Sequence, residues 1–219
     1  AAMEDVELRN PGELYDKYPH ELSGGMRQRA MLAAAIVCRP KLLIADEPTT
    51  ALDVQTQDGI LELLKKLNQK YGMSILFISH NLRVVEKLCG RVLVMKSGEV
   101  VEEGSVEGIF GNPQTEYTKE LIAAIPTACG KNEGDKSTVD EAGMEKDMWE
   151  PRKVLEVRNL NAYYREGRAR RRILQDVSFA LHEGEIVGLV GESGSGKTTL
   201  CKCILGLLKD YEGEVIHHT

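Results

Sequence analysis

The sequence predicts an α/β protein in which a mostly parallel β-sheet is flanked by helices. Short apolar runs alternate with longer segments of helical periodicity along much of the chain. Runs too short for a helix, such as Leu42-Leu43-Ile44-Ala45, are typical of strands buried on both faces. Strand and helix in alternation favour parallel pairing, because each helix carries the chain back to the starting edge of the sheet.

The elements of the first part, from about residue 15 to 125, follow from local signals. Ser23 is a suitable N-cap for a first helix and Pro40 stops it. Asp53 caps a second helix, and Gly72 ends it. The turn Lys96-Ser97-Gly98 is typical of a hairpin. We therefore expect a first helix that starts at Ser23 and continues through 26–38, and further helices at 54–71 and 81–89. Strands are expected at 41–46 and 74–79, and a hairpin is expected from 91–95 and 99–103.

The second part begins after a polar stretch. Residues 127–151 lose the apolar pattern and hold three lysines against seven acidic residues, a net charge of −4. This composition predicts a disordered acidic linker. Beyond it we expect strands at 153–157, 173–181 and 185–190, then a glycine-rich loop and a helix to about residue 207.

Composition excludes several classes of protein. The 219 residues carry a net charge of −6, which gives no general reason to expect a nucleic-acid surface. No apolar run approaches the roughly 20 residues that span a bilayer, and we expect no secretory signal. The five cysteines form no CxxC pair, so a reduced, cytosolic protein is expected, with Cys201 and Cys203 as buried apolar residues. The arginines at 165, 168 and 170–172 are expected in a solvated loop between strands.

A glycine-rich segment between a predicted strand and helix has the pattern of a phosphate-binding loop. Gly191-Glu192-Ser193-Gly194-Ser195-Gly196-Lys197-Thr198 matches it in full. Glycines let backbone N–H groups turn toward phosphate oxygens, and the helix N-terminus favours negative charge. Lys197 can reach the β- and γ-phosphates of a nucleotide, and Thr198 can bind Mg²⁺. The expected phosphate-binding residues are Gly191, Ser193, Gly194, Ser195, Gly196, Lys197, Thr198 and Thr199.

Polar side chains follow two other predicted strands. Asp46 and Glu47 end the first, and His80 ends the second. Ligands of open α/β sheets bind beyond the carboxyl ends of strands, where these residues should lie. Asp46 is suited to bind Mg²⁺ through water, and Glu47 to polarise an attacking water. Alternatively the acid pair is a helix cap and the histidine is structural.

A second glycine-rich helix start lies near the beginning of the chain. Ser23, Gly24 and Gly25 combine a hydroxyl, free N–H groups and a helix N-terminus, so they form another candidate anion site. A chain with two such sites binds either two nucleotides or one nucleotide that is held from both sides.

These motifs together resemble the ABC ATPases. Leu22–Gln28 resembles the signature loop of that family, Asp46-Glu47-Pro48-Thr49 the Walker B segment, Ala51-Leu52-Asp53 the D-loop and Ile78-Ser79-His80 the H-loop. The resemblance implies a P-loop NTPase-type sheet with an antiparallel β subdomain, and ATP and Mg²⁺ as cofactors. It further implies a head-to-tail dimer with a second ABC ATPase domain, in which ATP lies between the P-loop of one domain and the signature loop of the other.

The resemblance also assigns roles to single residues. It implies that His80 contacts the γ-phosphate, that Asp53 acts across the dimer interface, and that Glu47 is catalytic. An aromatic residue ahead of the P-loop is expected to stack on adenine. Tyr164 fits that position best by spacing, and Tyr163 is the alternative.

Two features resemble the oligopeptide and dipeptide importer branch: Met26, and the segment 112–121. That resemblance implies ATP hydrolysis that powers import, membrane-spanning permease subunits, an indirect solute-binding protein, no nucleic acid, and a place at the cytoplasmic face of the cell membrane. With only Cys129 in the region where some members carry a cysteine cluster, no iron–sulfur site is expected. The alternatives are a tandem ABC ATPase acting on ribosomes or nucleic acid, and a non-catalytic nucleotide-binding fragment.

The order of the motifs departs from the family, because the P-loop follows the signature loop and no glutamine loop is present. We therefore interpret residues 1–126 as the C-terminal part of a first ABC ATPase domain and 152–219 as the N-terminal part of a second, joined by 127–151. Unpaired parallel strands expose apolar edges, so the two parts are expected to pair as a circularly permuted domain. Thr198 would then lie beside Asp46, with Ser23 pointing away. A tandem parent would instead place Lys197 across from Ser23.

Overall fold

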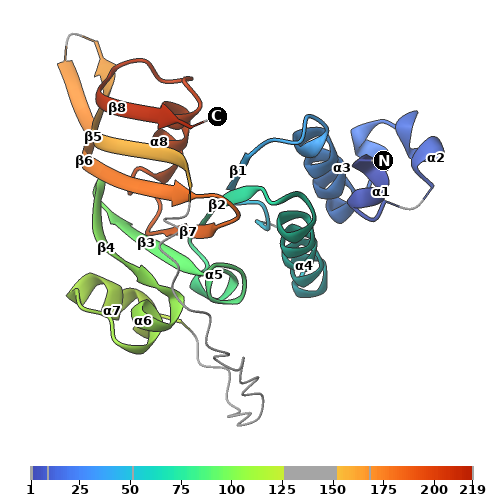
Figure 1. The fold of residues 1–219 in the computed structure, drawn as a ribbon, viewed down its shortest axis with the longest axis horizontal. Coiled ribbons are helices and arrows are strands. Elements are labelled where there is room, and N and C mark those ends of the chain that lie inside the picture. Colours follow the sequence, from blue (N-terminus) through green and yellow to red (C-terminus); the bar gives the residue numbers. More distant parts are fainter. Residues whose placement is uncertain (1, 9, 51, 126–151, 168, 219) are drawn as a thin grey trace.

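The computed structural model describes residues 2–8, 10–50, 52–125, 152–167 and 169–218 (Figure 1). The predicted linker at 127–151, together with Cys129, lies outside these described residues.

The central sheet has five strands in the order β1-β2-β7-β3-β4. They are β1 (Leu42–Asp46), β2 (Ser74–Ser79), β7 (Ile186–Val190), β3 (Arg91–Lys96) and β4 (Glu99–Ser105). The first four are parallel, and β4 runs antiparallel to β3. Because β7 pairs with β2 on one side and β3 on the other, both parts of the chain build one sheet. The expected pairing of the two parts is confirmed.

Strand β2 shows why these strands read as continuous apolar runs. All six of its residues are buried. Ile75 and Phe77 point into one core, and Leu76 and Ile78 point into a second core on the opposite face. Alternate side chains of a strand point to opposite faces, so a sheet covered on both sides needs apolar residues at every position.

Helices cover the first face of the sheet. Residues of α3 (Gly24–Ile36), α4 (Val54–Tyr71), α5 (Leu82–Leu88), α6 (Val106–Gly111) and α7 (Glu116–Ala123) pack in the first core. At the end of the molecule that carries α3 lie α1 (Ala2–Asp5), α2 (Pro11–Tyr15) and the short 3-10 turn Pro19–Glu21 (Figure 1). Among the helices described, none is both long and apolar enough to cross a bilayer.

An antiparallel sheet covers the second face. Its order is β6-β5-β8, with β5 (Lys153–Glu166), β6 (Ala169–His182) and β8 (Tyr211–His217). Helix α8 (Lys197–Ile204) packs in the same core, where Cys201 and Cys203 are buried as expected. The α/β class with an antiparallel β subdomain is confirmed.

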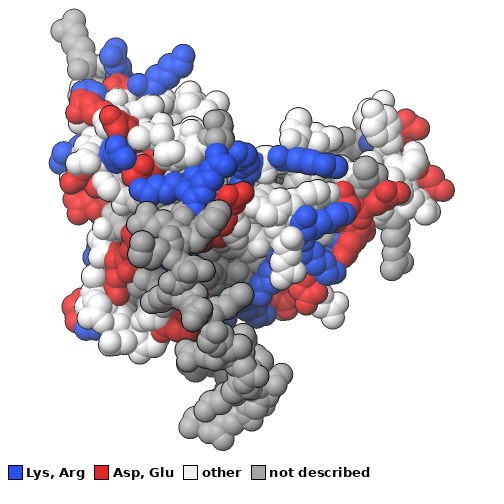
Figure 2. Space-filling view, viewed as in Figure 1, with Lys and Arg blue, Asp and Glu red and all other residues white. Residues whose placement is uncertain are grey.

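The arginine segment differs from the expectation of a solvated loop, which is wrong for Arg165 and for 170–172. Strands β5 and β6 extend well beyond the predicted 153–157 and 173–181 and carry these arginines. Arg170 lies over the Tyr163 ring at 3.6 Å and forms ion pairs with Asp210 and Glu212. On the face drawn in Figure 2, acidic side chains lie among the basic ones over this sheet.

Elements near both ends of the described chain were not predicted from the sequence. Strand β8 has no buried residue, and its alternation is too weak to predict a strand. Helices α1 and α2 precede the expected start of structure at about residue 15. By contrast, α3 begins directly after its predicted cap, because the Ser23 hydroxyl accepts a hydrogen bond from the Met26 N–H. Helix α4 spans the predicted range, with Gly72 in the left-handed conformation that ends it.

The tail segment, residues 112–125, is anchored to β4 by one carboxylate. Glu102 accepts hydrogen bonds from the Gln114 N–H at 2.7 Å, the Thr115 N–H at 3.0 Å and the Thr115 hydroxyl at 2.9 Å. Burial raises the pKa of Glu102, but these bonds outweigh it and lower the pKa to about 2. The ionised carboxylate is therefore the form that holds the start of α7 in place.

This anchor predicts a pH-dependent contribution to stability. Because the pKa of Glu102 falls from 4.5 in the unfolded chain to about 2 in the folded one, its stabilisation is complete above pH 4.5 and is lost as the pH falls toward 2. Glu102→Gln should lower the melting temperature at pH 7 by about 2–4 °C. The difference in melting temperature between the native chain and Glu102→Gln should decrease as the pH falls from 4.5 to 2. Glu99→Gln, at the exposed start of the same strand, is the control; an equal effect from it would contradict the assignment.

Candidate nucleotide-binding site

The loop between β7 and α8 is built on three glycines with left-handed backbone. Gly191, Gly194 and Gly196 have φ angles of 153°, 85° and 106°. A Cβ at Gly191 would lie 2.1 Å from the Met95 carbonyl oxygen. Only glycine fits where the loop passes so close to β3, and the turn then brings the N-terminus of α8 to the carboxyl edge of the sheet.

Lys197 is nearly buried inside this loop. Its ammonium donates to the Gly191 carbonyl at 2.8 Å and to the Glu192 carbonyl at 2.7 Å. Burial lowers the pKa of Lys197, and the nearby carboxylates of Glu47 and Asp46 oppose that shift. Further negative charge in the loop would favour the ammonium form, so the lysine is suited to bind an anion such as phosphate.

Thr198 and Asp46 lie side by side, although they are far apart in the sequence. The Thr198 hydroxyl donates to the Asp46 carboxylate at 3.0 Å. The predicted adjacency of these two residues is confirmed, and the opposing arrangement, with the carboxylates remote from the P-loop, is excluded. Two neighbouring oxygen ligands, one at the end of β1 and one in the first turn of α8, fit Mg²⁺, which binds one or two protein oxygens together with water and phosphate.

Glu47 and His80 form a second polar pair at the same edge. The Glu47 carboxylate lies 2.7 Å from His80 Nδ1 and accepts from the His80 backbone N–H at 3.2 Å. Its other oxygen accepts from the Thr50 hydroxyl at 2.9 Å. Glu47 has a left-handed φ of 50°, a conformation that a non-glycine residue adopts only at a cost. The turn places the Glu47 carboxylate beside His80, just beyond the end of β2.

One cleft of about 760 Å³ joins these groups. Its lining includes the predicted residues Asp46, Glu47, His80 and Tyr164, and the predicted loop residues 191, 193, 194 and 196–199. Ser195 is buried within the loop. Tyr163 does not line this cleft; its hydroxyl bonds Glu212 and its ring faces Arg170. Of the two tyrosines, Tyr164 is therefore the one placed to contact a ligand of the P-loop.

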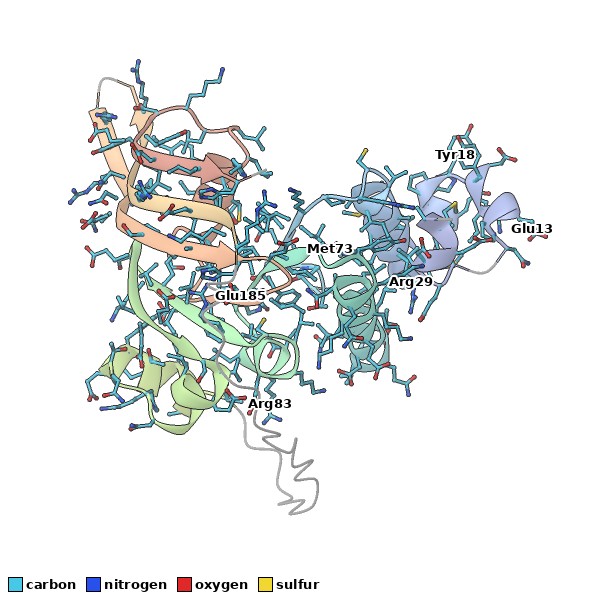
Figure 3. The ribbon with its side chains drawn as sticks, in the orientation of Figure 1. Glu13, Tyr18, Arg29, Met73, Arg83 and Glu185 are labelled. Carbon is cyan, nitrogen blue, oxygen red and sulfur yellow. The ribbon has the colours of Figure 1, made fainter. Side chains whose placement is uncertain are left out.

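The second predicted anion site lies elsewhere. Ser23 and Gly25 line a separate hollow of about 540 Å³ that shares no residue with the P-loop cleft. Gly24 precedes Gly25 in the first turn of α3, and a Cβ at Gly25 would lie 2.7 Å from Thr56 Cγ2. Figure 3 shows Arg29, another residue of that hollow, on the side of the molecule that carries α1 and α2. The chain does not bring its signature-like loop to its own P-loop.

Asp53 is likewise absent from the P-loop cleft. It caps α4 by accepting from the Thr56 N–H at 3.0 Å and the Thr56 hydroxyl at 2.7 Å. The hydroxyl of Thr56 is the main cause of the lowered pKa of Asp53. In a single copy of the chain this carboxylate acts as a helix cap beside the signature-like loop.

Several lining residues were missed by sequence reasoning: Leu82, Leu121, Ile173 and Glu192. Glu192 lies inside the recognised motif, so the motif itself was the signal for it. Leu121 comes from the tail helix, and no local pattern predicts that α7 reaches the P-loop. That contact depends on how the tail packs against the sheet.

The fold and cleft define a class of protein: a P-loop NTPase-type domain with a paired carboxylate and hydroxyl at the phosphate site. Comparison with known families narrows this class. The family described as "ABC transporter" matches residues 1–50 and 174–219. The chain is 43% identical over 234 residues to the glutathione import ATP-binding protein GsiA of Salmonella typhimurium, covering 98% of this chain and 37% of that protein. It is 46% identical over 195 residues to the peptidoglycan transport ATP-binding protein YejF of Agrobacterium fabrum, covering 89% and 34%.

The chain belongs to the ABC transporter family and corresponds to the ATP-binding domains of that family. It spans a little over a third of the length of the curated relatives it matches. Among solved structures it is similar to the ATP-binding cassette MJ0796, with 34% identity, 48% of this chain and 44% of that chain covered, and a TM-score of 0.42.

Proposed function

We propose that the chain binds ATP with Mg²⁺ in the P-loop cleft and contributes to its hydrolysis. The hydrogen bond between Thr198 and Asp46 carries the proposal, because it unites the Mg²⁺ ligands of the two motifs in one cleft. Lys197 would hold the β- and γ-phosphates, Tyr164 would stack on adenine, and Thr198 and Asp46 would hold the ion. The bound Mg²⁺ would neutralise charge that develops on the phosphates.

In this proposal Glu47 orients the attacking water and His80 positions both the carboxylate and the γ-phosphate. The Glu47–His80 contact of 2.7 Å supports a shared role. The water must approach the γ-phosphate in line with the bond that breaks, and a fixed carboxylate supplies that orientation. The leaving group is ADP, and the water becomes part of inorganic phosphate.

Completion of the site requires a second ABC ATPase domain. Ser23, Gly24 and Gly25 lie at the N-terminus of a 13-residue helix, outside the P-loop cleft of their own chain. In a head-to-tail dimer they would meet the γ-phosphate held by the partner, and Asp53 would lie at that interface. Each domain would thus supply half of the other's site.

We further propose that this hydrolysis powers import of peptides or similar small solutes. The names of the relatives, one for glutathione import and one for peptidoglycan transport, support this direction. The partners would be membrane-spanning permease subunits and, indirectly, a solute-binding protein, with the ATPase at the cytoplasmic face of the membrane. Residues 1–126 and 152–219 would derive from successive ABC ATPase domains of one longer protein.

The proposal predicts that a negative charge in the signature-like loop blocks dimer formation. A Cβ at Gly24 meets only Leu52 at 3.5 Å, and a carboxylate suits a helix N-terminus, so Gly24→Glu should fold. Light scattering with Mg·ATP should show dimers for the native loop in a slowly hydrolysing Glu47→Gln background. Adding Gly24→Glu should remove them while calorimetry still detects ATP binding by monomers.

Gly12→Glu is the control, since a Cβ there meets nothing within 4 Å and its helix, α2, lines neither site. It should leave ATP-dependent dimers intact. A chain that binds no Mg·ATP would refute the proposed function, and dimers that survive Gly24→Glu would refute the head-to-tail arrangement.

A further inference from the structure

The tail segment reaches the P-loop through one side chain. Tyr117, in the first turn of α7, is buried with 7% of its surface exposed. Its hydroxyl accepts a hydrogen bond from the Glu192 N–H at 3.2 Å. One turn later on α7, Leu121 lines the nucleotide cleft. The tail therefore forms part of the wall and support of the site.

The peptide group that Tyr117 holds joins Gly191 to Glu192. Its N–H is bonded to Tyr117, and its carbonyl, that of Gly191, accepts from the Lys197 ammonium at 2.8 Å. The next carbonyl, that of Glu192, accepts from the same ammonium at 2.7 Å and from the Ser195 N–H at 3.2 Å. A shift of Glu192 would therefore move the lysine that the proposed function places on the phosphates.

Other contacts fix Tyr117 in place. The Lys96 ammonium lies 4.3 Å from the centre of its ring. The start of α7 is held by Glu102, as described above. Burial raises the pKa of Tyr117, so its phenol stays neutral and its oxygen is available as an acceptor at neutral pH.

We propose that Tyr117 is a positioning residue for nucleotide binding, which acts by holding the Glu192 peptide and, through it, Lys197. This inference rests on the proposed function. In it the tail helix sets the affinity of the P-loop for nucleotide phosphates without touching them. Any displacement of α7 would loosen the P-loop through the same hydrogen bond.

The test is Tyr117→Phe in the full chain, which keeps the ring and its packing and removes only the acceptor. Mg·ADP affinity measured by calorimetry should fall roughly 3- to 10-fold, as expected for one lost hydrogen bond that supports a charged contact. In the nucleotide-free chain, labelled with ¹⁵N-glutamate, the Glu192 amide resonance should shift. A purely structural role would move melting temperature but not that single resonance.

Tyr71→Phe is the matched control, because it removes a hydroxyl bonded to Asp5 at 2.5 Å, away from the P-loop cleft. It should leave both Mg·ADP affinity and the Glu192 resonance unchanged. Equal affinity in Tyr117→Phe and the native chain, or an unmoved Glu192 resonance, overturns the inference. A native chain that fails to bind Mg·ADP instead overturns the proposed function, and the inference with it.

Discussion

Replacing Lys197 by alanine is expected to reduce Mg·ATP affinity by roughly 10- to 100-fold, the worth of a charge-assisted hydrogen bond to phosphate. In the free chain the ammonium bonds groups of the loop itself, namely two carbonyls and the Ser195 hydroxyl, so its removal leaves the sheet and both cores in place. Calorimetry gives the affinity, and circular dichroism checks that the fold is retained.

Lys87→Ala is the control for this prediction. Lys87 is an exposed lysine on α5 whose ammonium pairs with Asp58 at 2.9 Å, away from the P-loop cleft. Its loss should leave Mg·ATP affinity unchanged. If Lys197→Ala binds Mg·ATP as tightly as the native chain, the P-loop is not the phosphate site.

Glu47→Gln is expected to retain Mg·ATP binding and to slow phosphate release by about 100-fold or more. The amide keeps the size of the carboxylate, but it loses the negative charge that orients water and one acceptor for His80. Single-turnover measurements with protein in excess over ATP separate the hydrolytic step from binding.

Glu62→Gln, an exposed position on α4, makes the same chemical change away from the cleft. It should hydrolyse ATP at the native rate. Native phosphate release by Glu47→Gln would remove Glu47 from the water-orienting role and leave His80 as the group to test next.

The sequence predicts the elements whose signals are local. Asp53 and Gly72 mark both ends of α4, and the apolar run of β2 reflects burial on both faces. The P-loop and the carboxylates of Asp46 and Glu47 can also be predicted from the sequence, because their chemistry requires particular residues at fixed spacing. Pairing the two parts required only the argument that parallel strands do not leave their edges exposed.

What the sequence does not reveal depends on contacts between distant residues. The outer part of the β5–β6 hairpin is polar, and ion pairs such as Arg170 with Asp210 hold it; apolar periodicity does not register such pairs. The support of Glu192 by Tyr117 joins residues 75 positions apart. No sequence pattern around Tyr117 or Glu192 predicts the contact, and only the packed structure shows it.

Strand β7 occupies a middle position in the sheet, although it is encoded long after its neighbours. Ile75 on β2 pairs with Ile186, and Arg91 on β3 pairs with Val187. During synthesis, β2 and β3 emerge before β7, and until β7 follows the position between them in the sheet is unfilled. Such long-range closure is slow, and an unfilled slot accepts the same strand from another copy. Exchange of β7 between nascent chains is therefore the misassembly expected of this topology. High-level expression should favour strand-exchanged dimers over monomers.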